Sequence, residues 1–131
     1  LTEFKESPRS VLLGTQSFWE GVDVRGAGLK LLIIDKLPFP NPSDPIYNAQ
    51  SILIRSNGGN GFTELALPKT VLSLKQGFGR LMREASDMGL FVLGDNRVLT
   101  KSYGGKFLKS LPDMPWLGSQ QEAITYMESL D

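Results

Sequence analysis

Three short apolar runs divide the chain into segments typical of buried parallel strands. They cover residues 11–14, 29–35 and 90–94. Short continuous apolar runs predict strands that are covered on both faces. Amphipathic segments separate the second and third runs, and strands that alternate with helices indicate a parallel sheet flanked by helices. The pattern therefore predicts a single α/β domain over residues 1–131.

Local signals predict the boundaries of three helices. Asp44 and Pro45 look like an N-cap followed by proline at the first helical position, and this helix runs to about Ser56. Its apolar positions fall on one side, and the glycines that follow it form a turn. A short helix is expected near residues 105–110. A last helix is expected over residues 119–130, where Ser119 and Glu122 have capping-box spacing.

Residues 69–84 predict a longer helix with two opposed faces. Four apolar residues fall on one face and four polar residues on the other: Val71, Leu74, Phe78 and Leu81 against Lys69, Gln76, Arg80 and Arg83. Two guanidinium groups on one face are suited to gripping a phosphate, although a solvated basic face has the same pattern. Gly77 and Gly79 each cost about 1 kcal/mol in a helix interior, so we expect a close backbone approach there.

Composition limits the chemistry available to the chain. It has 131 residues, a formal net charge of zero, no cysteine and no histidine. These absences exclude disulfides, thiolate or imidazole metal sites and a Ser-His-Asp triad. No apolar run approaches the length of a membrane span and no signal peptide is visible, so we expect a cytoplasmic protein. The first residue is leucine rather than methionine, which favours an excised fragment.

Two segments carry specific motifs. Residues 76–83 read Gln-Gly-Phe-Gly-Arg-Leu-Met-Arg and match Q-x-x-G-R-x-x-R, the sixth signature motif of superfamily 2 helicases. Residues 14–23 contain Ser-Phe-Trp-Glu-Gly-Val-Asp and resemble the fifth motif in the wording of the XPD/DinG branch. Residues 32–40 and 100–104 also resemble that branch. The resemblance covers about residues 10–112. The chain is similar to the second motor domain of a DinG-like bacterial helicase.

The resemblance implies a RecA-like fold of the P-loop NTPase type without a P-loop of its own. The strand and helix that carry the family's fourth motif are absent upstream, so an incomplete domain with an exposed sheet edge is expected. The resemblance also implies the site residues. Arg80 and Arg83 act as arginine fingers, and Gln76 orients the attacking water or contacts the γ-phosphate. Glu20, Gly21, Asp23 and Gly79 belong to the nucleotide-binding set.

Single-stranded DNA is the expected partner, beside the first motor domain of the same polypeptide. Candidate nucleic-acid contacts are Ser17, Trp19, Arg97 and Lys101, of which the last two begin a basic stretch without an acid over residues 96–112. Trp19 is suited to stacking a base, and it is equally suited to packing against the sheet. A monomer is expected.

The chain lacks the parts that bind and hydrolyse ATP alone. It has no G-x-x-x-x-G-K-[ST] cradle and no acidic box. The resemblance places ATP and Mg²⁺ mainly on the absent first domain, where the family's iron–sulfur cluster also lies if the parent has one. Two other readings stay open: a single-stranded nucleic-acid-binding module without motor function, and a non-catalytic RecA-like interaction domain, against which the intact arginines argue.

Overall fold

The computed structural model describes residues 1–21 and 28–131, except for the side chains of residues 20 and 21. Asp23, a predicted nucleotide contact, lies outside this part. The elements in chain order are α1 (Thr2–Glu6), α2 (Phe18–Gly21), β1 (Leu31–Ile34), α3 (Pro45–Ser56), the π-helix η2 (Phe62–Ala66), α4 (Leu67–Phe78), β2 (Leu90–Leu93), α5 (Arg97–Thr100), α6 (Gly104–Ser110) and α7 (Gln120–Ser129).

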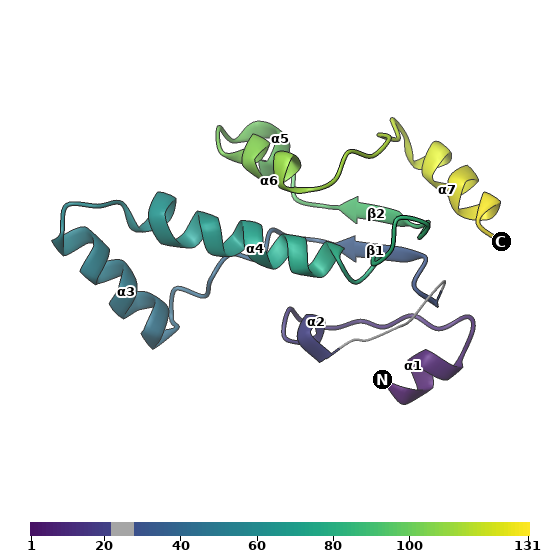
Figure 1. Cartoon of the computed structure of the whole chain (residues 1–131), viewed down its shortest axis with the longest axis horizontal. Helices are drawn as coiled ribbons and strands as arrows, with labels where there is room; N and C mark the ends of the chain where they lie inside the picture. The colour runs from purple at the N-terminus through teal and green to yellow at the C-terminus, as the bar shows by residue number, and fades with distance from the viewer. Residues whose placement is uncertain (22–27) are drawn as a thin grey trace.

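A two-stranded parallel sheet forms the centre of the described fold. Leu31 pairs with Leu90 and Ile34 with Leu93, so the two strands are aligned over their whole length. Helix α4 runs along the strands in the opposite direction (Figure 1). Its end therefore lies at the amino ends of the strands. The predicted α/β class with a parallel sheet is confirmed.

The predicted strand over residues 11–14 is wrong. In the described part of the chain the sheet contains β1 and β2 alone, and residues 11–14 have no regular secondary structure. Val11 is 85% exposed and Leu13 is 89% exposed. A strand is stabilised by hydrogen bonds to a neighbouring strand and by burial of its side chains. This segment has the composition of a strand but meets neither condition here.

The sheet is covered unequally on its two faces. Leu32 and Ile34 point towards the core under α4, whereas Leu31 and Ile33 point outwards, and Ile33 is 61% exposed. The outer face and α7 line an open apolar hollow of about 480 Å³. The expectation that both faces are buried is therefore wrong for the outer face, because α7 covers only part of it.

The core lies where α4, α6 and the carboxyl ends of the strands meet. Leu74 of α4 and Phe107 of α6 are fully enclosed. The other members of the buried cluster are Ile34, Leu37, Leu67 and Val98. Phe39, Phe62, Tyr103 and Phe107 form an aromatic group on one side of this cluster, with ring centroids 5.2–6.2 Å apart.

The predicted caps are confirmed. The carboxylate of Asp44 accepts hydrogen bonds from the backbone of Ile46 and Tyr47, at 2.8 and 3.0 Å, and Pro45 starts α3. Gly58 follows α3 with φ of +82°, a conformation that favours glycine. Ser119 caps α7 through the backbone N–H of Glu122 at 3.2 Å. Helix α3 extends away from the sheet and leaves its apolar face exposed (Figure 1).

Helix α4 ends earlier than its periodicity predicts. The expected helix reached residue 84, but α4 stops at Phe78 and Gly79 is its C-cap. The next bonds join residues three apart, from Arg80 N–H to the Gly77 carbonyl and from Leu81 N–H to the Phe78 carbonyl. Two glycines within three residues weaken the helix where the apolar spacing alone predicts that it continues. Arg80 and Arg83 therefore follow α4 instead of lying on its polar face.

Candidate functional site

The arginine turn, residues 79–83, follows the carboxyl end of α4. Leu81 is buried, and its side chain packs against Gly89 near the carbonyl of Lys30, so the turn lies at the amino ends of both strands. The carboxyl end of a helix carries partial negative charge, which stabilises a guanidinium placed beside it. Gln76 lies within α4 one turn before Arg80 and is exposed.

Arg80 is the more enclosed of the two predicted arginine fingers. Its Nε is buried and has no hydrogen-bond partner among the residues that the structure describes. A buried donor without a partner costs about 1–3 kcal/mol, and more when the group is charged. Arg80 as a whole is half-buried, so its Nε is desolvated while part of the side chain still reaches the surface.

Asp87 fixes the backbone on the far side of the arginine turn. Its carboxylate accepts hydrogen bonds from the backbone N–H groups of Arg83 and Glu84, both at 2.9 Å. These two bonds, from Glu84 first, lower the pKa of Asp87 below its usual value, and the charge of Arg83 adds to the effect. The backbone that carries Arg83 is thus held in one conformation by a carboxylate four residues away.

The residues of the fifth-motif resemblance pack directly on α4. Trp19 lies against Gly77, and a Cβ added at Gly77 would meet two carbons of the indole ring at 2.9 Å. Gln16 donates a hydrogen bond to the hydroxyl of Ser73 at 3.4 Å. The close approach expected at the glycines is confirmed at Gly77. The structure therefore brings segments 14–21 and 76–83 together, although they are more than fifty residues apart in the chain.

Other predicted contacts of this segment are described only in part. Gly21 and Glu20 belong to α2, but their side chains lie outside the described set, as does the whole of Asp23. Ser17 is exposed, and its hydroxyl bonds that of Thr15 at 2.9 Å. The nucleotide-binding role of the first three residues and the nucleic-acid role of Ser17 stay predictions.

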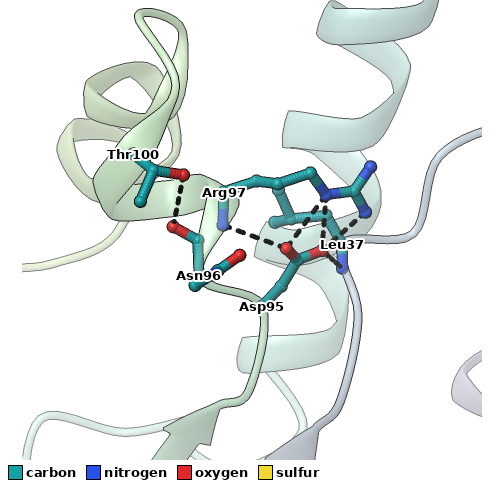
Figure 2. Close-up of polar contacts among 5 residues, drawn as sticks. All are labelled: Leu37, Asp95, Asn96, Arg97 and Thr100. Atoms are coloured by element: carbon teal, nitrogen blue, oxygen red, sulfur yellow. Dashed lines mark hydrogen bonds and ion pairs between the residues drawn. The ribbon is translucent and has the colours of Figure 1, made fainter.

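Arg97 lies at the opposite end of the sheet, in a tight polar network (Figure 2). Its guanidinium donates to both carboxylate oxygens of Asp95, at 2.6–3.1 Å. The same carboxylate accepts the backbone N–H groups of Leu37 at 2.8 Å and Arg97 at 3.1 Å. The guanidinium also lies 5.0 Å from the centre of the Phe39 ring. These bonds, from the Arg97 side chain first, hold the pKa of Asp95 well below its usual value and raise that of Arg97.

Asp95 thus fastens the segments that follow β1 and β2 to each other, a role that the sequence reading missed. The signal was present: Asp95 follows a buried strand directly and has an arginine two residues later. The predicted nucleic-acid role of Arg97 stays a prediction, although its Nε and Nη2 already serve this network. Lys101 follows α5 directly and is exposed.

Two negative observations apply to the described residues. They contain no group of three or more acidic side chains that could hold a metal ion. None of their helices has the length and apolar character needed to cross a membrane.

Comparison with known proteins gives a consistent result. The helicase C-terminal domain family matches residues 1–114. The chain is 46% identical over 127 residues to the ATP-dependent DNA helicase YoaA of Escherichia coli K12. This match covers 97% of the present chain and 20% of that protein. It is 45% identical over 109 residues to a Bacillus subtilis protein named 3'-5' exonuclease DinG, covering 83% of this chain and 12% of that protein.

A third relative comes from another bacterium. The ATP-dependent helicase DinG of Mycobacterium tuberculosis H37Rv is 42% identical over 110 residues, covering 84% of this chain and 17% of that protein. The chain therefore spans a fifth or less of the length of these relatives. The motif-bearing segments at 14–23 and 76–83 both lie within the family match.

Proposed function

The chain belongs to the helicase C-terminal domain family, and we propose that it is the second motor domain of an ATP-dependent DNA helicase of the DinG/YoaA type. In this proposal the parent protein carries a first motor domain that binds ATP and Mg²⁺. The present chain supplies the opposite wall of the ATP cleft. Single-stranded DNA is the substrate along which the two domains move.

The proposed catalytic groups of this chain are the guanidinium groups of Arg80 and Arg83. Negative charge develops on the oxygens of the γ-phosphate and on the leaving oxygen during phosphoryl transfer. An arginine from the facing domain stabilises that charge, and removal of such a finger typically costs about 10³–10⁵ in rate. Gln76, exposed one turn earlier, orients the attacking water or contacts the γ-phosphate.

One observation carries this assignment. The Nε of Arg80 is buried and lacks a hydrogen-bond partner among the described residues, immediately beside a surface turn. A charged donor in that state is suited to an anionic acceptor that arrives from another domain. The backbone bonds from Arg83 and Glu84 to Asp87 support the proposal as well, because they fix the turn before any ligand binds.

The proposed nucleic-acid contacts differ in exposure and in what their side chains already bind within this chain. Lys101 and Ser17 are exposed and fit contacts with a DNA backbone. Arg97 is bound to Asp95, so we assign it mainly to holding the carboxyl ends of the strands together. Gly21, Glu20, Asp23 and Gly79 remain the proposed nucleotide contacts, on the strength of the family motifs.

The test is single-strand-stimulated ATPase activity of the full-length protein that contains this chain. Arg80→Ala and Arg83→Ala are each expected to lower kcat by about a hundredfold or more, with ATP binding largely kept. Arg55→Ala is the matched control, because Arg55 is an exposed arginine at the end of α3. Its turnover should equal that of the unchanged protein.

Unchanged turnover in both arginine variants contradicts the finger assignment. The alternative, a single-stranded nucleic-acid-binding module without motor function, then predicts DNA binding that is indifferent to ATP and falls steeply with salt. Anisotropy of a labelled oligonucleotide, measured with and without ATP at two salt concentrations, separates the two functions.

A further inference from the structure

Trp19 and Gly77 form a close contact between the two motif-bearing segments. A Cβ built on Gly77 would lie 2.9 Å from Cε3 and Cζ3 of the indole and 3.2 Å from Cη2. Ordinary carbon contacts are about 3.5–4.0 Å, so any residue larger than glycine pushes the ring or the helix away. The six-membered ring of Trp19 therefore packs directly against the backbone of α4.

A second bond engages the same stripe of the helix. Gln16 donates to the hydroxyl of Ser73, four residues before Gly77, and residues four apart lie one above the other on a helix. Gln16 and Trp19 thus contact the last two turns of α4 at successive points on one face. Gly77 itself accepts the backbone N–H of Arg80 at 3.1 Å. The residue that Trp19 touches is therefore the one to which the backbone of Arg80 is hydrogen-bonded.

We propose that Trp19 is a positioning residue that sets the location of Arg80 through its contact with Gly77. The proposal rests on the assignment of Arg80 as a catalytic arginine. In this role Trp19 touches neither ATP nor DNA bases. A shift of segment 14–21 moves the end of α4, and the guanidinium moves with it. The glycine of the sixth motif and the tryptophan of the fifth form one complementary pair.

Size complementation in the full-length protein tests this pair. Gly77→Ala should lower single-strand-stimulated kcat by about tenfold to a hundredfold with KM for ATP nearly unchanged, because small displacements of a catalytic group have effects of this size. Trp19→Phe shortens the ring that meets the new methyl group. The double variant Gly77→Ala with Trp19→Phe should therefore recover at least about fivefold of the lost kcat, a non-additive result expected for residues in contact.

Gly105→Ala is the matched control, because a Cβ at Gly105 meets nothing within 4 Å. Its kcat should equal that of the unchanged protein. Thermal unfolding of every variant separates a displaced arginine from a damaged fold. A Gly77→Ala defect that follows only the loss of thermal stability, without recovery in the double variant, overturns the proposal.

Single-strand affinity gives the second decisive measurement. Under our proposal Trp19→Phe and Trp19→Leu should both leave the Kd for oligo-dT within about twofold, because Trp19 touches no base. Base stacking by Trp19 instead predicts that Trp19→Leu loses about five- to a hundredfold in affinity, the range for one stacked base. That loss, with kcat unchanged at saturating DNA, also overturns the positioning role.

The two proposals fail in distinguishable ways. If Arg80→Ala loses turnover but the Gly77 and Trp19 variants show no complementation, the assignment of Arg80 as a catalytic arginine stands and the positioning role of Trp19 is refuted. If Arg80→Ala keeps full turnover, the assignment of Arg80 as a catalytic group is refuted, and Trp19 then has no catalytic group to position.

Discussion

Replacement of Asp95 by alanine is expected to destabilise the protein by about 3 kcal/mol. The carboxylate accepts a hydrogen bond from the buried backbone N–H of Leu37, and its removal takes that acceptor away from a buried donor, at a cost of about 1–3 kcal/mol. The variant also loses the charge-assisted bonds from Arg97, which contribute about 1.5–3 kcal/mol in enclosed surroundings. The side chain of Arg97 is 38% exposed, so water replaces part of this second contribution.

Asp95→Asn refines the experiment. An amide oxygen can still accept the N–H of Leu37, but the charge that attracts Arg97 is gone. We expect about 1–2 kcal/mol of destabilisation, which is clearly less than for alanine. Asp113→Asn is the control because Asp113 is exposed, and its effect should stay within about 0.5 kcal/mol.

Urea unfolding near neutral pH measures these differences. The pH dependence follows from the lowered pKa of Asp95 in the folded protein. A depressed carboxyl pKa gives stability that is complete above the unfolded value of about 3.9 and is lost as the pH falls towards the folded value. The difference between the unchanged protein and Asp95→Asn should therefore be constant at about pH 5–8 and shrink below about pH 4. Equal stability of Asp95→Ala and the control refutes the reasoning.

Two further substitutions have sharp expectations. Gly104→Ala places a Cβ against the carbonyl oxygen of Val98, so we expect about 1–3 kcal/mol of destabilisation in urea unfolding. Gly105→Ala beside it should be neutral or slightly stabilising, and equal effects of the two variants would contradict the packing of α5 on α6. Asp44→Ala removes the acceptor for two N–H groups at the start of α3 and should cost about 1 kcal/mol, with Asp44→Asn restoring most of it; a silent alanine variant would show that α3 does not depend on its cap.

The features predicted correctly from sequence are those that depend on neighbours in the chain. The caps of α3 and α7 need only Asp44 or Ser119 and the N–H groups two or three residues later. The sixth-motif match needs only eight consecutive residues. Such local signals are complete within the sequence, so they transfer directly to the structure.

The features predicted wrongly depend on residues distant in the chain or on local preferences that oppose each other. Residues 11–14 have strand composition, but strand formation requires a partner strand that sequence pattern does not identify. Helix α4 stops at Phe78 because the glycines outweigh the apolar spacing that continues to Leu81. Trp19 fits both core packing and base stacking in sequence; the structure adds its close contact with Gly77, and its nucleic-acid role stays a prediction.

The location of the arginine turn connects these errors to the proposed function. A continuous helix would hold Arg80 and Arg83 on a solvated face, with all their donors hydrated. The early end of α4 instead buries the Nε of Arg80 while Asp87 and Trp19 fix the backbone on either side. In the proposed role, an incoming phosphate would offset the cost of that desolvated donor, so the turn would favour the phosphate more than a hydrated arginine would. The glycines that shorten the helix are therefore part of what would make Arg80 an effective catalytic group.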